Sequence, residues 1–256
     1  MQDNPVRAKL AKGGTAFGQM AFEFFTPGLC QIMANAGAEF VILDTEHSGV
    51  GIETIKSQVA YARGTGLVPI VRVTGTHYHL IAPMLDAGVR GIMVPMVETA
   101  EQARKIASWC RYRPRGVRGL AFGMPHDDYE GGSHIPKMKA ANERTLVIAL
   151  IETAAGIENV DAIVATPGID VGWMGHYDLT NSMGIDGQFD HPRYKAAAKK
   201  LAKACAKSGK PAGFLCGDVK TGKQYLRWGY RMLCYGTDIA VYQQALAAGI
   251  AGLKGK

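Results

Sequence analysis

The chain has 256 residues, of which 47% are hydrophobic and 20% charged, and its formal net charge is +7 at pH 7. This composition is typical of a compact globular protein and excludes a disordered or fibrous one. Because the lysines and arginines are dispersed or spaced as on the solvent-facing side of a helix, the charge does not indicate a nucleic-acid partner.

The five cysteines do not form a recognisable framework. They are odd in number and far apart in the sequence, which argues against both structural disulfides and a zinc site. No uncharged apolar stretch reaches the 18 or so residues of a membrane span, and residues 1–15 lack the apolar core of a signal peptide. We therefore expect a soluble, cytoplasmic protein that does not enter a membrane.

Short apolar runs recur along the chain, and a segment with helical periodicity follows each of them. The eight predicted strands are Thr15–Met20, Phe40–Leu43, Val68–Val73, Gly91–Val94, Leu146–Ile151, Val171–Gly175, Pro211–Cys216 and Met232–Tyr235. The predicted helices are Pro27–Ala36, Ile52–Gly64, Tyr78–Ala87, Ala100–Trp109, Ala154–Ala165, His191–Ser208, Val219–Gly229 and a closing segment near Ile239–Leu253.

The strands are uniformly apolar rather than alternating, as in parallel strands that are covered on both faces. Eight β-then-α units in about 250 residues predict an α/β protein with a single (β/α)8 TIM barrel over residues 1–256. The alternative is a doubly wound sheet. Such a sheet usually carries a glycine-rich turn after its first strand, and the residues that follow Gly18 lack that pattern.

Barrel enzymes place their chemistry on the loops after the C-terminal ends of the strands. Those ends are polar here. They carry Asp44, Glu46 and His47 after the second strand, Arg72 on the third, Glu152 after the fifth, Gly175, His176, Tyr177 and Asp178 after the sixth, and Thr237 and Asp238 after the eighth.

Glu152 and Asp178 end successive strands, so that both carboxylates can reach one cation. Two oxygen ligands with room for water and substrate suit Mg²⁺ or Mn²⁺ better than zinc. The alternative is that each acid caps the helix that follows it.

His47 follows two acidic residues at a strand end, a setting that suits general acid/base chemistry. Asp44, Glu46 and Asp86 are its possible carboxylate partners. Arg72 closes an apolar strand and can bind a carboxylate or a developing oxyanion, or pair with an acidic neighbour, and these two roles are compatible.

The sequence gives little support for Schiff-base catalysis or for a phosphate site. No lysine lies in a predicted strand, so Schiff-base catalysis has no obvious carrier. The segment Gly217–Lys223 stands where barrels often bind phosphate, but it is not a P-loop, and a helix cap at Asp218 explains it as well.

Taken in order, these motifs resemble the class II pyruvate aldolases of the HpcH/HpaI aldolase family. The matching segments are Val41–Ser48, Pro69–Val73, Met84–Gly88, Gly91–Pro95, Arg111–Tyr112, Gly116–Gly119, Ile151–Thr153 and Gly175–Thr180. The resemblance implies a barrel in which a divalent metal, usually Mg²⁺, Mn²⁺ or Co²⁺, chelates the carboxylate and keto oxygens of pyruvate. It also implies a homo-oligomer, a hexamer built as a trimer of dimers, in which the C-terminal helix at about 239–253 is exchanged between paired barrels.

The resemblance further assigns a role to each site residue. It makes Glu152 and Asp178 the metal ligands and places Arg72 on the keto oxygen that becomes an enolate. It makes His47, paired with Asp86, the acid/base group. Asp44 and Glu46 are expected in the second layer around the metal, and the backbone of Gly175, His176, Tyr177 and Asp178 is expected to hold the pyruvate carboxylate.

The sequence departs from the family pattern at two places. His176 and Tyr177 stand where the family commonly has Pro-Ala, and Leu150 stands where a glutamine is frequent. These changes leave open whether the donor is pyruvate or hydroxypyruvate, and the aldehyde is likewise not identified. The implied reaction is reversible aldol cleavage of a 4-hydroxy-2-oxo acid. Its rivals are a citrate-lyase-β or malyl-CoA-type lyase, although no C-terminal extension follows the last predicted helix, and a non-catalytic barrel that binds a small acid.

Overall fold

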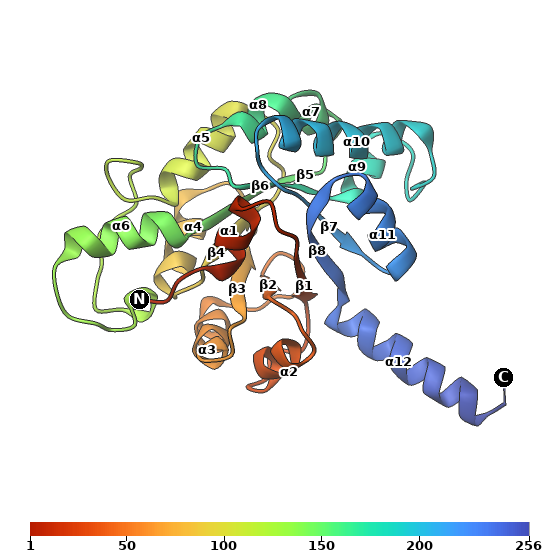
Figure 1. Cartoon of the computed structure of the whole chain (residues 1–256), viewed down its shortest axis with the longest axis horizontal. Coiled ribbons are helices and arrows are strands. Elements are labelled where there is room, and N and C mark those ends of the chain that lie inside the picture. The colour runs from red at the N-terminus through yellow and green to blue at the C-terminus, as the bar shows by residue number, and fades with distance from the viewer. Residues whose placement is uncertain (256) are drawn as a thin grey trace.

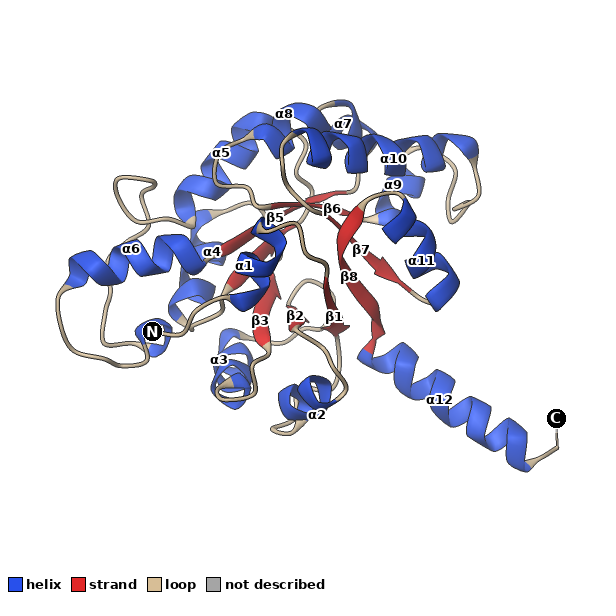
Figure 2. Ribbon diagram, in the orientation of Figure 1, coloured by secondary structure: helices blue, strands red, loops and turns tan. Residues whose placement is uncertain are grey.

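Eight parallel strands close into a barrel in chain order, with β8 paired to β1 (Figures 1 and 2). We describe residues 1–255 from a computed structural model. The strands are β1 (Ala16–Ala21), β2 (Phe40–Asp44), β3 (Val68–Arg72), β4 (Gly91–Val94), β5 (Leu146–Ile151), β6 (Val171–Met174), β7 (Ala212–Cys216) and β8 (Tyr230–Thr237). The predicted TIM barrel is confirmed.

Helices surround the barrel and connect its strands (Figure 2). They are α1 (Pro5–Ala11), α2 (Leu29–Asn35), α3 (Ile52–Ala62), α4 (Tyr78–Asp86), α5 (Ala100–Trp109), α6 (His134–Arg144), α7 (Ala154–Glu158), α8 (Val160–Ala165), α9 (His176–Ser182), α10 (Pro192–Lys207), α11 (Val219–Arg227) and α12 (Asp238–Leu253), with a 3₁₀ turn at Pro125–Asp127. The predicted helix over residues 154–165 is divided into α7 and α8 at Asn159. Helices α1 and α6 were not predicted, and α9 was expected only as a helix that begins near Asp178.

Helix α1 closes the N-terminal end of the barrel. Its buried residues, Val6 and Leu10, belong to the same apolar cluster as the inward-facing side chains Phe40, Val68 and Leu146. The helix begins at Asn4, whose side chain accepts a hydrogen bond from the Arg7 N–H. Because this end is covered, a site inside the barrel has to open at the C-terminal ends of the strands.

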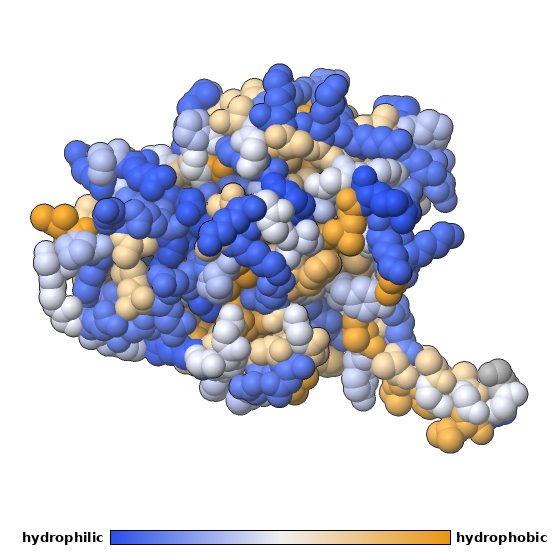
Figure 3. Space-filling view, in the orientation of Figure 1, coloured by the Kyte–Doolittle hydropathy of each residue, from blue (hydrophilic) through white to orange (hydrophobic). Residues whose placement is uncertain are grey.

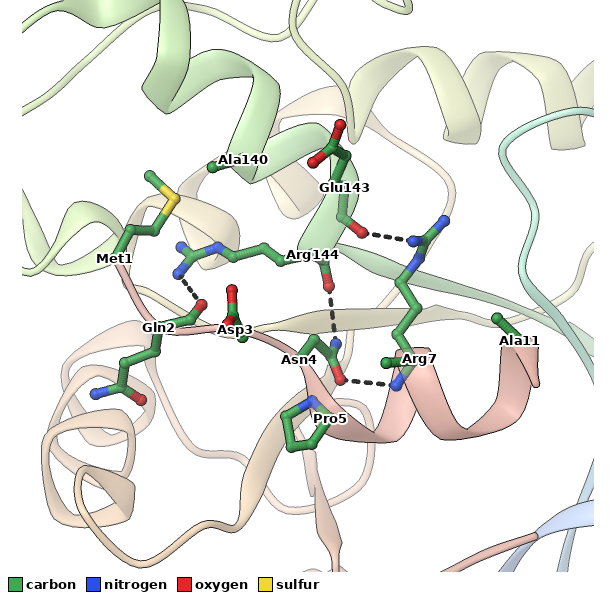
Figure 4. Close-up of a pocket in the computed structure, with 11 residues that line it drawn as sticks. Met1, Gln2, Asp3, Asn4, Pro5, Arg7, Ala11, Ala140, Glu143 and Arg144 are labelled. Atoms are coloured by element: carbon green, nitrogen blue, oxygen red, sulfur yellow. Dashed lines mark hydrogen bonds between the residues drawn. The ribbon is translucent and has the colours of Figure 1, made fainter. Parts of the chain in front are cut away.

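A cavity of about 430 Å³ lies beside α1 (Figure 4). The Asn4 amide donates to the carbonyls of Arg90, just before β4, and Arg144, two residues before β5, so this cavity is at the N-terminal end of the barrel. Arg144 donates to the Gln2 carbonyl at 3.1 Å, and Arg7 donates to the Glu143 carbonyl. These bonds tie the N-terminal segment to α6, which is a structural role.

Helix α12 leaves the barrel after β8 and projects from it (Figure 1). Its large apolar side chains are exposed, with Tyr242 at 59% and Leu253 at 92% of their maximal surface. In Figure 3, apolar residues are prominent on this projection, between paler ones. Within residues 1–255, no helix combines the length and apolar character that crossing a membrane requires.

Candidate active site

The C-terminal strand ends converge on a cavity of about 280 Å³. Its walls bring together most of the predicted site residues, namely His47, Arg72, Glu152, Gly175, His176, Tyr177 and Asp178. The cavity is also lined by side chains that the motifs did not mark, namely Met20, Phe22, Met93, Trp173, Met174 and Leu215, and by Leu150 and Thr237. The alternation of inward-facing residues along each strand was the signal that could have found them.

Asp44 holds Arg72 in place from the neighbouring strand. The two residues are register partners in β2 and β3, and Arg72 Nε donates to Asp44 Oδ1 at 2.7 Å. Asp44 is fully buried and also accepts the backbone N–H groups of Glu46 and His47. Glu46 Oε2 lies 3.4 Å from the same Nε. In the part of the chain that the structure describes, no hydrogen bond uses the two terminal amino groups of Arg72, which therefore remain available to a substrate oxygen.

Helix capping does not account for the two acids. The helix after β5 is capped by Thr153, whose hydroxyl accepts the Gly156 N–H at 3.0 Å. Helix α9 has Gly175 at its N-cap, and Asp178 lies within its first turn. Neither carboxylate therefore makes the capping hydrogen bond of the structural alternative, although Asp178 stands where the α9 helix dipole favours a negative charge.

Glu152 is buried in a site rich in negative charge. It is 3% exposed, and its Oε1 accepts the Met96 N–H at 2.7 Å. Burial raises the pKa of Glu152 to about 7, and the charges of Asp178 and Glu46 add to that rise. Burial also raises the pKa of Glu46, although Arg72 and His47 oppose the shift.

This donor set fits a divalent cation. A buried carboxylate that faces two others is costly unless a positive charge joins them, and hard cations such as Mg²⁺ prefer oxygen ligands. Among residues 1–255, no group of three or more His, Cys, Asp or Glu side chains has the geometry of a metal cage. Two protein ligands would leave several coordination positions for water and substrate.

Gly175 provides the space that Glu152 occupies. A Cβ at position 175 would lie 2.5 Å from both the Cβ and the Oε2 of Glu152. Any other residue there would have to displace the carboxylate.

The expected pairing of His47 with Asp86 is not formed within the described chain. Asp86 Oδ1 accepts a hydrogen bond from Arg118 at 2.6 Å, whereas the carboxylate beside His47 Nε2 is that of Glu46, at 3.7 Å. The separation of Asp86 from His47 follows from the direction of α4. Asp86 is the last residue of the nine-residue helix α4, which runs back from the strand ends over roughly 12 Å.

His176 contributes a neutral wall to the cavity rather than a charge. Its ring packs against Phe189 and Phe214, with centroids 5.2 and 5.0 Å away. Burial lowers the pKa of His176 to about 4. Tyr177 is 65% exposed at the mouth of the cavity.

Comparisons with known proteins agree with this geometry. Residues 22–245 match the model of the HpcH/HpaI aldolase/citrate lyase family. The chain is 32% identical over 252 residues to a hydroxypyruvate/pyruvate aldolase of Chromohalobacter salexigens, covering 98% of each. It is 32% identical over 215 residues to a 5-keto-4-deoxy-D-glucarate aldolase of Klebsiella pneumoniae, covering 84% of this chain and 83% of that one. The solved HpcH/HpaI aldolase of Desulfitobacterium hafniense superposes with a TM-score of 0.93 at 28% identity, covering 99% of this chain and 97% of that one.

Proposed function

The chain belongs to the HpcH/HpaI aldolase/citrate lyase family, and from that premise we propose that a divalent metal at Glu152 and Asp178 supports its reaction. Its relatives are named aldolases of pyruvate, hydroxypyruvate and keto-deoxy sugar acids. It is therefore an aldehyde-lyase that reversibly cleaves a 4-hydroxy-2-oxo acid to a 2-oxo acid and an aldehyde. The observation that carries the metal proposal is the meeting of the Glu152 and Asp178 carboxylates with Arg72 at one cavity, with the charge of Glu46 close enough to raise the pKa of Glu152.

Glu152 and Asp178 would hold Mg²⁺, Mn²⁺ or Co²⁺. Such an ion withdraws electron density from the keto group and stabilises the negative charge of an enolate. Arg72, fixed by Asp44, points its free amino groups at the keto oxygen and shares that charge. The backbone N–H groups of Gly175–Asp178, at the start of α9, orient the carboxylate of the 2-oxo acid.

His47 is the acid/base group in this proposal. In cleavage it accepts the proton of the C4 hydroxyl, directly or through water, and in synthesis it returns that proton. Glu46, 3.7 Å from Nε2, is the carboxylate available to it within the chain. Because Asp86 pairs with Arg118 within the chain, we propose that an Asp86 partner for His47 would come from a second copy of the chain.

An assembly of several copies follows from the exposed α12. Its apolar side chains are left uncovered by the barrel, and a second copy of the chain is the occupant that would bury them. We propose a homo-oligomer in which α12 is exchanged between paired barrels, with a hexamer as the expected assembly.

Metal removal tests the proposed chemistry. Pyruvate release from a panel of 4-hydroxy-2-oxo acids is followed with a coupled dehydrogenase, and EDTA should abolish it until Mg²⁺, Mn²⁺ or Co²⁺ is restored. Borohydride added with pyruvate should leave the enzyme active, because no lysine adduct forms. Full activity in the chelator, or a trapped lysine adduct, would contradict the proposal. A parallel assay with a CoA thioester detects the rival lyase activity.

A further inference from the structure

The cavity has an apolar floor beneath its polar rim. Met20, Met93, Leu150 and Trp173 line it from β1, β4, β5 and β6. Each is at most 3% exposed, and all four belong to the apolar cluster inside the barrel. Leu215 from β7 lines the same cavity and packs against that cluster.

The floor lies one side-chain layer below the residues assigned to the reaction. Leu150 precedes Glu152 by two positions and Trp173 precedes Gly175 by two, so that within each pair both residues face the barrel axis. The polar groups of the cavity therefore belong to the rim. They are the Arg72 guanidinium, the carboxylates of Glu152 and Asp178, the backbone of α9, and the side chains of His47, His176, Tyr177 and Thr237.

The floor is held rigidly. A Cβ at Gly213 would lie 2.1 Å from a carbon of the Trp173 ring, so the indole fills the space that this glycine leaves in β7. The indole N–H is the one strong hydrogen-bonding group among the four floor side chains.

Resting on the proposed function, we propose that the donor site selects pyruvate over hydroxypyruvate. The carboxylate and keto oxygens of either donor need the polar rim, which leaves C3 against the floor. Pyruvate places a methyl group there, whereas hydroxypyruvate places a hydroxyl that loses its water and finds no partner on Met or Leu side chains. Apolar pockets reject an added hydroxyl by no more than about 100-fold, so the expected preference is roughly 10- to 100-fold in kcat/KM.

The test uses a half-reaction that needs no aldehyde. The enzyme with Mg²⁺ exchanges C3 protons of each donor in D₂O: a C3 proton leaves and a deuteron from solvent replaces it. Proton NMR gives kcat/KM for each donor after subtraction of the exchange without enzyme. Equal values, or a preference for hydroxypyruvate, would overturn the inference and leave the proposed function standing. Exchange with neither donor would instead contradict the proposed function.

Variants at two floor positions test whether the apolar floor sets the preference for pyruvate. Leu150→Asn places an amide of similar size on the floor and should raise the ratio of hydroxypyruvate to pyruvate exchange at least about tenfold. The matched control Leu150→Met keeps the floor apolar and should keep the ratio of the wild type. Trp173→Phe removes the indole N–H and should preserve the preference for pyruvate. An unchanged ratio in folded Leu150→Asn, or a selective loss of hydroxypyruvate exchange in Trp173→Phe, would show that the apolar floor does not set the choice.

Discussion

The carboxylate of Glu152 occupies space that only a glycine at position 175 leaves open. Gly175→Ala would place a methyl group 2.5 Å from Glu152 Oε2 and push the carboxylate away. Since changes beside a metal ligand commonly cost 10- to 100-fold in affinity, we expect Mn²⁺ binding to weaken by about that factor.

Titration of Mn²⁺ followed by electron paramagnetic resonance checks this expectation. Gly217→Ala is the matched control, because a Cβ there meets nothing within 4 Å. The control should bind Mn²⁺ as the wild type does. Equal affinity in both variants would remove Glu152 from the metal site.

Arg72 and His47 stand at different strand ends and should act at different steps. Arg72→Ala removes a partner of the developing oxyanion, so C3 proton exchange, decarboxylation of oxaloacetate and aldol cleavage should all fall by about 10²–10³. His47→Ala removes only the group that serves the C4 hydroxyl.

Decarboxylation of oxaloacetate involves no C4 hydroxyl, so it should survive in His47→Ala far better than cleavage does. General base catalysis contributes about 10²–10⁴, and the ratio of decarboxylation to cleavage should therefore rise at least tenfold. Steady-state assays of both reactions on one preparation give this ratio. If both fall in parallel while metal affinity is intact, His47 acts on the enolate itself.

The sequence located residues that follow strands better than residues on helices. Glu152, Asp178, Arg72 and His47 were predicted from their positions at strand ends, and all four line one cavity. The distance between Asp86 and His47 depends on the length and direction of α4. The spacing of the motifs in the sequence does not give that distance. The apolar floor was missed because its side chains look like ordinary core residues in the sequence.

At the scale of elements, the apolar runs predicted every strand, and β2 to β6 are buried along their whole length. Helix α6 was missed because its buried face is largely polar. Asn142 exchanges hydrogen bonds with the backbone of Tyr112, and Arg144 donates to backbone carbonyls. A helix that packs through such contacts lacks the apolar stripe on which prediction rests.

The long connection between α5 and α6 is anchored by Asp127. This fully buried carboxylate accepts the N–H groups of Gly123 and Met124, both at 2.8 Å, and pairs with Lys137 at 2.6 Å. Burial by itself would raise the pKa of Asp127, but these partners outweigh it and lower the pKa to about 2.

A depressed pKa means that the folded state stabilises the charged form. The contribution of Asp127 is therefore present above its ordinary value near 4 and is lost as the pH falls towards 2. Asp127→Asn should lower the free energy of unfolding at pH 7 by roughly 1–3 kcal/mol and lose less between pH 4 and 2 than the wild type does. Urea unfolding at several pH values measures both effects. The exposed Asp161→Asn is the control, and the same pH profile in all three proteins would contradict this assignment.

At the scale of the whole molecule, α1 covers one end of the barrel and the reactive cavity opens at the other. The cavity is formed by residues from all eight strands or the loops after them, so the closed barrel is what brings its parts together. The fold could be predicted because each βα unit repeats the same pattern. The repeating βα pattern does not predict how copies of the chain assemble.

Helix α12 carries the evidence for that assembly. Tyr242, Leu246 and Ile250 recur at four-residue spacing and are all exposed, and Asp238 is the one buried residue of the helix in the described chain. Near its start, the helix touches the barrel through the edge-on contact of Tyr242 with Phe24. An apolar helix that projects in this way gains most of its stability from a partner surface.

We expect light scattering after gel filtration to give a multiple of the 27.4 kDa chain mass, with six copies as the predicted assembly. Leu246→Glu combined with Ile250→Glu puts two charges on the apolar face and should shift the protein to smaller species, since burying unpaired charges is costly. Gln244→Glu adds a charge two positions from Tyr242 and from Leu246, on another side of the helix, and should leave the assembly intact.

If Asp86 serves His47 across copies, aldol cleavage should fall together with the assembly in the double variant, while Gln244→Glu keeps both. A wild-type protein that elutes as a single 27.4 kDa species at micromolar concentration would contradict the exchange of α12 and, with it, any role for Asp86 beside His47.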